Sequence, residues 1–148
     1  MTFFAFEADF VDSLRCIPMQ VRYKLDTCGI KMKLSHWHQF TAVERQILVD
    51  LPCTTETEIK NYHDYLQNLI LERTGTPASK LPIEPHPLWL DNTQIPHDLQ
   101  LKAQETGVNI SLAQWINLTP LQRFALLKLS RPGHENQNFP KAIAEFNL

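Results

Sequence analysis

Apolar residues recur at helical spacing near the start of the chain, between residues typical of helix ends. Over residues 17–28 they fall three or four positions apart, on one face of a predicted helix: Ile17, Val21, Leu25 and Cys28. Pro18 suits the first position of this helix, and Gly29 suits the left-handed position that follows its last turn. The pattern predicts a helix at about 18–28, and Pro96 and Gly107 predict a second one at 96–106.

The correspondence of these two helices extends into a longer internal repeat. Residues 17–51 align with residues 95–129 at a constant offset of 78, without a gap, and 10 of the 35 positions are identical. Chance would give about two or three identities for ordinary composition. The sequence therefore predicts two similar helical lobes. The identical pairs are Ile17/Ile95, Pro18/Pro96, Lys24/Lys102, Gly29/Gly107, Leu34/Leu112, Trp37/Trp115, Thr41/Thr119, Arg45/Arg123, Leu48/Leu126 and Leu51/Leu129.

Within each copy, the spacing predicts two further helices. A short helix at Trp37, matched at Trp115, is expected to bury its indole, so that substitution by alanine costs about 3–5 kcal/mol. Thr41 and Thr119 suit the N-cap of helices of about ten residues that run through positions 51 and 129. The alternating apolar residues after each glycine fit either a strand or an extended connector.

The segments outside the repeat predict a long helix, a linker and a last short helix. Thr55 and Glu58 suit a capping box for a helix that ends before Gly75 and packs the lobes together. Five prolines at 77–96 predict an inter-lobe linker without regular structure. Its apolar side chains are expected to hold it against the surface: Ile83, Leu88, Trp89, Leu90 and Ile95. A loop at 131–139 and a helix near 141–146 complete the chain.

These elements predict an all-α fold, a single compact helical domain over residues 1–148. Its internal duplication (about 17–51 and 95–129) is joined by the long helix and the Pro-rich linker.

The 148 residues carry 14 Lys+Arg and 16 Asp+Glu, a net charge of −2, which argues against a polycationic nucleic-acid binder. No apolar run has the ~18 residues of a membrane span, and the acidic start does not resemble a signal peptide. We therefore expect a cytoplasmic protein.

The motifs of the common enzyme classes are missing from the sequence. It has no GxSxG elbow, no HExxH pair and no glycine-rich phosphate loop, with four glycines in total. His63 and Asp64 are neighbours on a helix, where adjacent side chains do not face each other, so no catalytic dyad is expected. The helices at 41–51 and 119–129 are too apolar to read a DNA groove. We predict no catalytic residues and no cofactor.

The histidines and cysteines raise the alternative of a metal site. His36 and His38 would converge only on an extended segment, whereas the predicted short helix separates them by about 200°. The three cysteines lack the CxxC spacing that structural zinc sites commonly use. Cys28 lies on the apolar helix face, where a small core residue is expected.

The clearest charge asymmetry is a basic, polar stretch near the C-terminus. It contrasts with an acidic group near the N-terminus, Glu7, Asp9 and Asp12. Its only acidic residues are Glu135 and Glu145, and its basic and polar residues are Arg123, Lys128, Arg131, His134, Asn136, Asn138 and Lys141. One interpretation is a solvated face, with Arg15 or Arg123 pairing an acid across the lobes. The other is a surface for an anion or an acidic partner, built by Arg123, Lys128 and Arg131. In the repeat, Lys128 replaces Asp50 and Arg131 replaces Cys53.

Several blocks of the chain resemble the cyanobacterial nitrate reductase-associated protein family. They are 6–19, 24–26, 28–31, 51–53, 84–87, 121–126, 128–132 and 134–136. The resemblance implies a non-catalytic accessory role in the assembly, cofactor insertion or activity of a cytoplasmic, ferredoxin-dependent molybdenum nitrate reductase. Nitrate reductase is the implied partner, with the molybdenum cofactor machinery as a second one.

The resemblance carries over no catalytic residues, so the partner surface is assigned by physical argument alone. We expect it at Lys128, Arg131, His134, Glu135 and Asn136, with Arg15. The alternative is a protein that handles a metal or the molybdenum cofactor. It would present Cys16, Cys28 or Cys53 together with His86 or His134.

Overall fold

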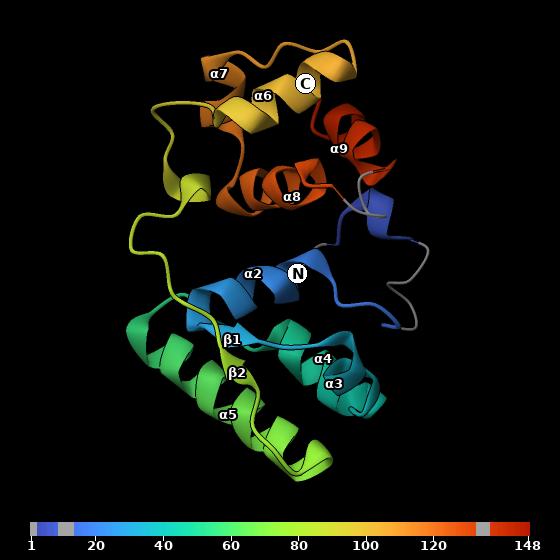
Figure 1. Cartoon of the computed structure of the whole chain (residues 1–148), viewed down its shortest axis with the longest axis vertical. Coiled ribbons are helices and arrows are strands. Elements are labelled where there is room, and N and C mark those ends of the chain that lie inside the picture. Colours follow the sequence, from blue (N-terminus) through green and yellow to red (C-terminus); the bar gives the residue numbers. More distant parts are fainter. Residues whose placement is uncertain (1–2, 9–13, 133–136) are drawn as a thin grey trace. The chain divides into compact units, whose positions relative to one another are not determined.

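The computed structural model describes residues 3–8, 14–132 and 137–148. The chain divides into two compact units, unit 1 (Met1–Ile83) and unit 2 (Glu84–Leu148). The fold is mostly helical, which confirms the predicted all-α class (Figure 1). None of the helices in the described ranges is both long and apolar enough to cross a bilayer.

Unit 1 contains four α-helices, a 3-10 turn and two very short strands in its described part. The 3-10 turn η1 spans Ala5–Glu7, and the helices are α2 (Met19–Cys28), α3 (Leu34–His38), α4 (Ala42–Asp50) and α5 (Glu56–Thr74). Strand β1 (Ile30–Lys31) pairs antiparallel with β2 (Ser79–Lys80), with Ile30 opposite Lys80. The predicted long helix is α5, which contacts α2 and α3 within unit 1.

Unit 2 is built around helix α8. The 3-10 turn η2 spans Leu88–Leu90, and the helices are α6 (His97–Glu105), α7 (Leu112–Asn117), α8 (Pro120–Ser130) and α9 (Phe139–Glu145). Helix α8 contacts η2, α6 and α9 (Figure 1). Its apolar side chains Phe124, Ala125 and Leu126 are fully buried.

The helix starts in the two units correspond at the offset of 78 residues. Helices α2, α3 and α4 begin at 19, 34 and 42, and α6, α7 and α8 begin at 97, 112 and 120. Pro18 and Pro96 are the N-cap residues instead of the first helical residues, so both helices begin one residue later than predicted. Trp37 and Trp115 are both 0% exposed, as expected from the sequence. Superposition of the two segments stays a prediction.

The threonine caps are confirmed in both units. The hydroxyl of Thr41 accepts a hydrogen bond from the Glu44 N–H at 3.1 Å, and the hydroxyl of Thr119 accepts one from the Gln122 N–H at 3.1 Å. Thr55 caps α5 in the same way, and the carboxylate of Glu58 accepts from the Thr55 N–H at 3.0 Å. These side chains satisfy N–H groups that a helix cannot pair internally.

The Pro-rich segment differs from the prediction in two respects. It contains regular structure, because β2 pairs with β1 and η2 forms a 3-10 turn. Three of its apolar side chains, Ile83, Leu88 and Leu90, are 50–59% exposed, so each is covered only in part. Trp89 does pack, with its ring 5.0 Å from the ring of Phe124. The prolines stand between the short elements, where no ladder hydrogen bond is required of them.

The last helix begins two residues earlier than predicted. Helix α9 starts at Phe139, within the segment expected to be a loop, and Pro140 lies in its first turn. Proline is compatible with the first turn of a helix because the N–H groups there have no partner within the helix. Burial of the Phe139 side chain, which is 0% exposed, adds an apolar contact that the helical spacing alone does not require.

Candidate partner surface

The predicted partner residues Lys128 and Arg131 lie at the C-terminal end of α8. Lys128 is in the last turn, half-buried, with its Nζ 5.3 Å from the ring centroid of Phe124. Arg131 is the exposed C-cap residue, and its N–H donates to the Lys128 carbonyl at 3.4 Å. Cations at this end of a helix interact favourably with its macrodipole. Both cations therefore have a local structural explanation, and their assignment to a partner surface stays a prediction.

The structure does not test the other predicted partner residues. His134, Glu135 and Asn136 lie outside the described residues. Arg15 belongs to unit 1, where its side chain is exposed and its carbonyl lies 3.2 Å from His38 Nε2. The assignment of these four residues stays a prediction.

Arg123 is a structural residue, which corrects the prediction that it helps to build an anion surface. It is 6% exposed, and its guanidinium donates to three carbonyls: Trp115 at 3.0 Å, Ile116 at 3.0 Å and Trp89 at 3.1 Å. These bonds stay within unit 2, so Arg123 supports its loops. A guanidinium has five N–H donors in a fixed plane, which suits this role.

Glu7 also has a structural role rather than a place in an acidic surface. Its carboxylate is 2% exposed and accepts hydrogen bonds from the N–H of Met19 at 2.7 Å and of Phe4 at 3.2 Å. Met19 is the first residue of α2, where an unpaired N–H and the positive end of the helix dipole both favour a carboxylate. Twelve residues separate Glu7 from Met19. A local capping pattern therefore could not have revealed this contact.

The cysteines proposed as metal ligands are mostly buried. Cys28 and Cys53 are 4% and 6% exposed, and Cys16 is half-buried. Burial raises the pKa of the Cys28 thiol to about 12 and that of Cys53 to about 11. A thiol binds a metal as the thiolate, so this environment works against the metal-handling alternative. In residues 3–8, 14–132 and 137–148, no three His, Cys, Asp or Glu side chains are grouped to hold a metal ion.

The histidines have separate surroundings. His36 Nδ1 accepts from the Lys33 N–H at 3.1 Å, whereas His38 lies beside the Arg15 carbonyl. His86 is exposed, and its backbone N–H donates to Glu84 at 3.4 Å.

The prediction for His63 and Asp64 was wrong in one respect. Their side chains do meet at 3.1 Å, because flexible χ angles let exposed neighbours bend toward each other.

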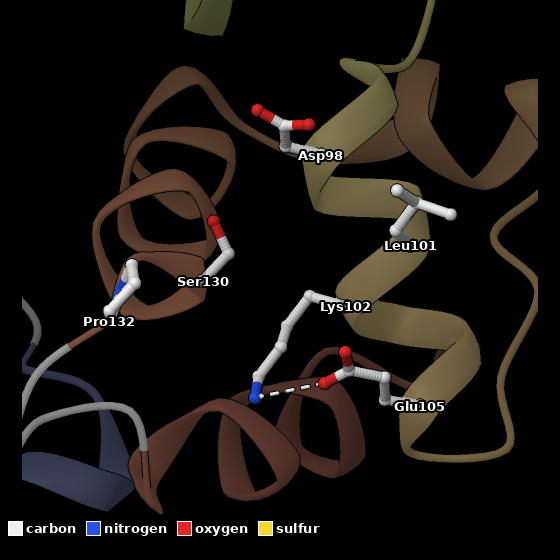
Figure 2. A pocket seen from close by; sticks show the side chains of 6 residues that line it. All are labelled: Asp98, Leu101, Lys102, Glu105, Ser130 and Pro132. Atoms are coloured by element: carbon white, nitrogen blue, oxygen red, sulfur yellow. Dashed lines mark hydrogen bonds and ion pairs between the residues drawn. The ribbon is translucent and has the colours of Figure 1, made fainter.

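A surface pocket between α6 and the end of α8 was not predicted. Its volume is about 270 Å³, and its lining comes from both helices and from one residue that follows α8: Asp98, Leu101, Lys102, Glu105, Ser130 and Pro132. Figure 2 shows the Lys102 ammonium turned toward Glu105, to which it donates at 3.2 Å, and away from Asp98. The repeat held a signal for this pocket, because Asp98 and Ser130 replace Gln20 and Pro52.

The chain matches the family described as conserved nitrate reductase-associated protein over residues 3–146. The chain belongs to this family. The name of the family indicates association with nitrate reductase, in agreement with the resemblance seen in the sequence. No curated protein and no solved structure is similar enough to count as a match.

The match covers nearly the whole chain, so both units belong to the family's common region. It includes the end of α8, with Lys128 and Arg131, and the pocket between α6 and α8. Membership assigns no role to any single residue.

Proposed function

We propose that this chain is a non-catalytic accessory protein that binds nitrate reductase and supports its assembly, cofactor insertion or activity. The enzyme in this proposal is a cytoplasmic, ferredoxin-dependent molybdenum nitrate reductase. Membership in the nitrate reductase-associated family is the observation that carries the proposal. The absence of the common catalytic motifs from the sequence agrees with an accessory role.

The positive surface at the end of α8 is the proposed contact with the enzyme. Lys128 and Arg131 stand where the first copy of the repeat has Asp50 and Cys53, so the charge at this helix end differs between two otherwise similar segments. A favourable dipole interaction is worth only about 0.3–1 kcal/mol and would be served by one cation. Two neighbouring cations offer a charged, hydrogen-bonding surface suited to an acidic face of the enzyme.

The first experiment identifies the step that the protein supports. In a strain that lacks the gene, nitrate reductase protein, its molybdenum content and its activity are measured separately. Loss of enzyme protein indicates assembly, loss of molybdenum at normal protein level indicates cofactor insertion, and loss of activity alone indicates a later step. Normal values of all three would contradict the proposal.

The second experiment tests the surface by returning a variant with Lys128→Glu and Arg131→Glu to that strain. The ring contact and the helix-end position of these cations contribute up to about 1 kcal/mol each. The sequence alone predicts that the reversal leaves thermal stability within about 1 kcal/mol, as is usual for surface changes. The contact of Lys128 with the Phe124 ring raises this expected cost. Thermal unfolding of the purified variant measures whether it remains folded. We expect impaired support of nitrate reductase.

A matched control reverses two exposed lysines of unit 1, Lys31→Glu and Lys60→Glu. It makes the same change in net charge at exposed positions that belong to the other unit. We expect this control to restore nitrate reductase activity fully. Full restoration by the α8 variant as well would overturn the surface assignment and leave the accessory role standing.

A further inference from the structure

The pocket between α6 and α8 lies beside a helix end that has a counterpart in unit 1. There, Lys24 occupies the repeat position of Lys102. The Lys24 ammonium is buried and donates to the carbonyls of Val49 at 2.7 Å and Leu51 at 2.6 Å, at the end of α4. It also lies 5.5 Å from the ring centroid of Tyr62. Unit 1 thus shows a cationic side chain bound at the C-terminus of this helix.

The same arrangement is built differently in unit 2. Lys102 donates to Glu105, on its own helix, instead of to the end of α8. The carbonyl of Leu127, which corresponds to Val49, accepts a hydrogen bond from the Ser130 hydroxyl at 2.8 Å. Pro52 at the matching position in unit 1 has no hydroxyl. The lysine that closes the helix end in unit 1 is therefore replaced in unit 2 by a serine and an adjoining pocket.

The charges around the pocket favour a cation. Glu105 and Lys102 neutralise each other as an ion pair, which leaves the exposed carboxylate of Asp98 on the wall. The C-terminus of α8 carries the negative end of the helix dipole, which Lys128 and Arg131 offset in part. An anion in the pocket would face the Asp98 carboxylate. Leu101 and Pro132, both exposed, add apolar surface for the methylene groups of a long side chain.

We propose that this pocket binds a lysine or arginine side chain of a partner protein. The cationic head would lie between the Asp98 carboxylate and the end of α8, with its stem on Leu101 and Pro132. The identity of the partner as nitrate reductase rests on the proposed function, whereas the chemistry of the pocket does not. A cation-binding pocket beside the positive Lys128 and Arg131 would set the register of the interface, since each charge accepts only its opposite.

The pocket is tested first without the enzyme. The full chain, labelled with nitrogen-15, is titrated with N-acetyl-arginine amide, N-acetyl-lysine amide and, as an uncharged control, N-acetyl-citrulline amide. We expect saturable shifts of the amides of Asp98, Leu101 and Ser130 with one or both cations, and none with citrulline. The comparison of arginine with lysine shows which cation fits.

Two variants make this titration decisive. Asp98→Asn removes the carboxylate while keeping its shape and is expected to abolish the saturable shifts. Glu72→Gln makes the same charge change at an exposed position of unit 1 and should leave them unchanged. Equal shifts with citrulline, persistence of the shifts in Asp98→Asn, or no shift with either cation would overturn the proposal.

A binding measurement with purified nitrate reductase separates this proposal from the proposed function. We expect Asp98→Lys to weaken binding at least about tenfold, and Glu72→Lys to leave it unchanged. Equal binding of Asp98→Lys and the wild-type chain would overturn the use of the pocket and leave the accessory function standing. Binding of the blocked amino acid without binding of the enzyme would support the pocket and contradict nitrate reductase as its partner.

Discussion

The guanidinium of Arg123 lies over the ring of Trp115, with its Cζ 5.7 Å from the ring centroid. Its Nε donates to the carbonyl of the same tryptophan at 3.0 Å. Unit 1 repeats this arrangement with Arg45 and Trp37, at 5.8 Å and 3.1 Å. In both units the indole N–H donates to a carbonyl of a segment that precedes the repeat, Leu14 or Asp91. The pair thus anchors that segment to the short helix.

The first prediction concerns the two tryptophans. Trp37→Ala and Trp115→Ala each remove a fully buried indole and its hydrogen bond. We expect each substitution to lower the free energy of unfolding by about 3–5 kcal/mol. Urea unfolding followed by circular dichroism measures the change. Near-native stability of both variants would contradict the buried structural role.

The second prediction compares two glycines at the same repeat position. Gly29 and Gly107 both have positive φ, +78° and +84°, where alanine costs about 1–2 kcal/mol. A Cβ on Gly29 would lie 2.9 Å from the Leu81 carbonyl oxygen and 2.8 Å from Ile83 Cγ1. A Cβ on Gly107 would have no such neighbour within 4 Å. Leu81 also donates its N–H to the Gly29 carbonyl.

Gly29→Ala should therefore destabilise the protein by at least about 1 kcal/mol more than Gly107→Ala, because a backbone oxygen cannot move aside without breaking the strand pairing. The midpoints of urea unfolding of the two variants test this difference. Equal losses of stability in the two variants would contradict the prediction that the Leu81 carbonyl resists displacement by a side chain at position 29.

The third prediction concerns pH. The Arg73 guanidinium, which donates to Glu44 at 3.2 Å, lowers the pKa of the Glu44 carboxyl below its ordinary value. The stabilisation is therefore present above the ordinary glutamate pKa and is lost as the pH falls through the lowered one. Glu44→Gln should keep the capping hydrogen bond, as Gln122 does at the matching position, and lose the ion pair.

We expect Glu44→Gln to cost no more than about 1 kcal/mol near neutral pH, because the Arg73 side chain is partly exposed and the pair is screened by solvent. The difference from wild type should shrink on acidification. Urea unfolding at about pH 7 and about pH 3 checks this. Arg73→Gln serves as the control, since the double variant should be no less stable than either single one. A difference independent of pH would contradict the assignment.

The fourth prediction concerns the thiols. Cys28 and Cys53 are buried, and burial raises the pKa of both side chains. The thiolate is the reactive form. In the native protein, iodoacetamide should therefore alkylate these two residues far more slowly than Cys16 at about pH 8. Mass spectrometry after iodoacetamide treatment, with and without denaturant, measures the rates. Labelling of Cys28 or Cys53 in native protein as fast as in denatured protein would contradict their burial.

The sequence by itself determined most of the helices and where they begin. Apolar spacing, the threonine caps and the repeated Pro, Gly and Trp positions act over a few residues, so they can be recognised without coordinates. They predicted the starts of α2, α4, α6 and α8 to within a residue or two and the burial of both tryptophans. The repeat also pointed to Lys128 and Arg131, since they change charge between matching copies.

Only the tertiary structure decided which polar residues serve the fold and which remain at the surface. The sequence left Arg123 between a structural role and an anion surface, and its guanidinium donates to three carbonyls, one of them 34 residues away. Glu7 reaches Met19 across the chain, and Lys24 reaches Val49 and Leu51, while the identical residue Lys102 turns to Glu105. Such contacts depend on which segments the folded chain brings together. Helical periodicity carries no information on them, because it records only which face of a helix is apolar.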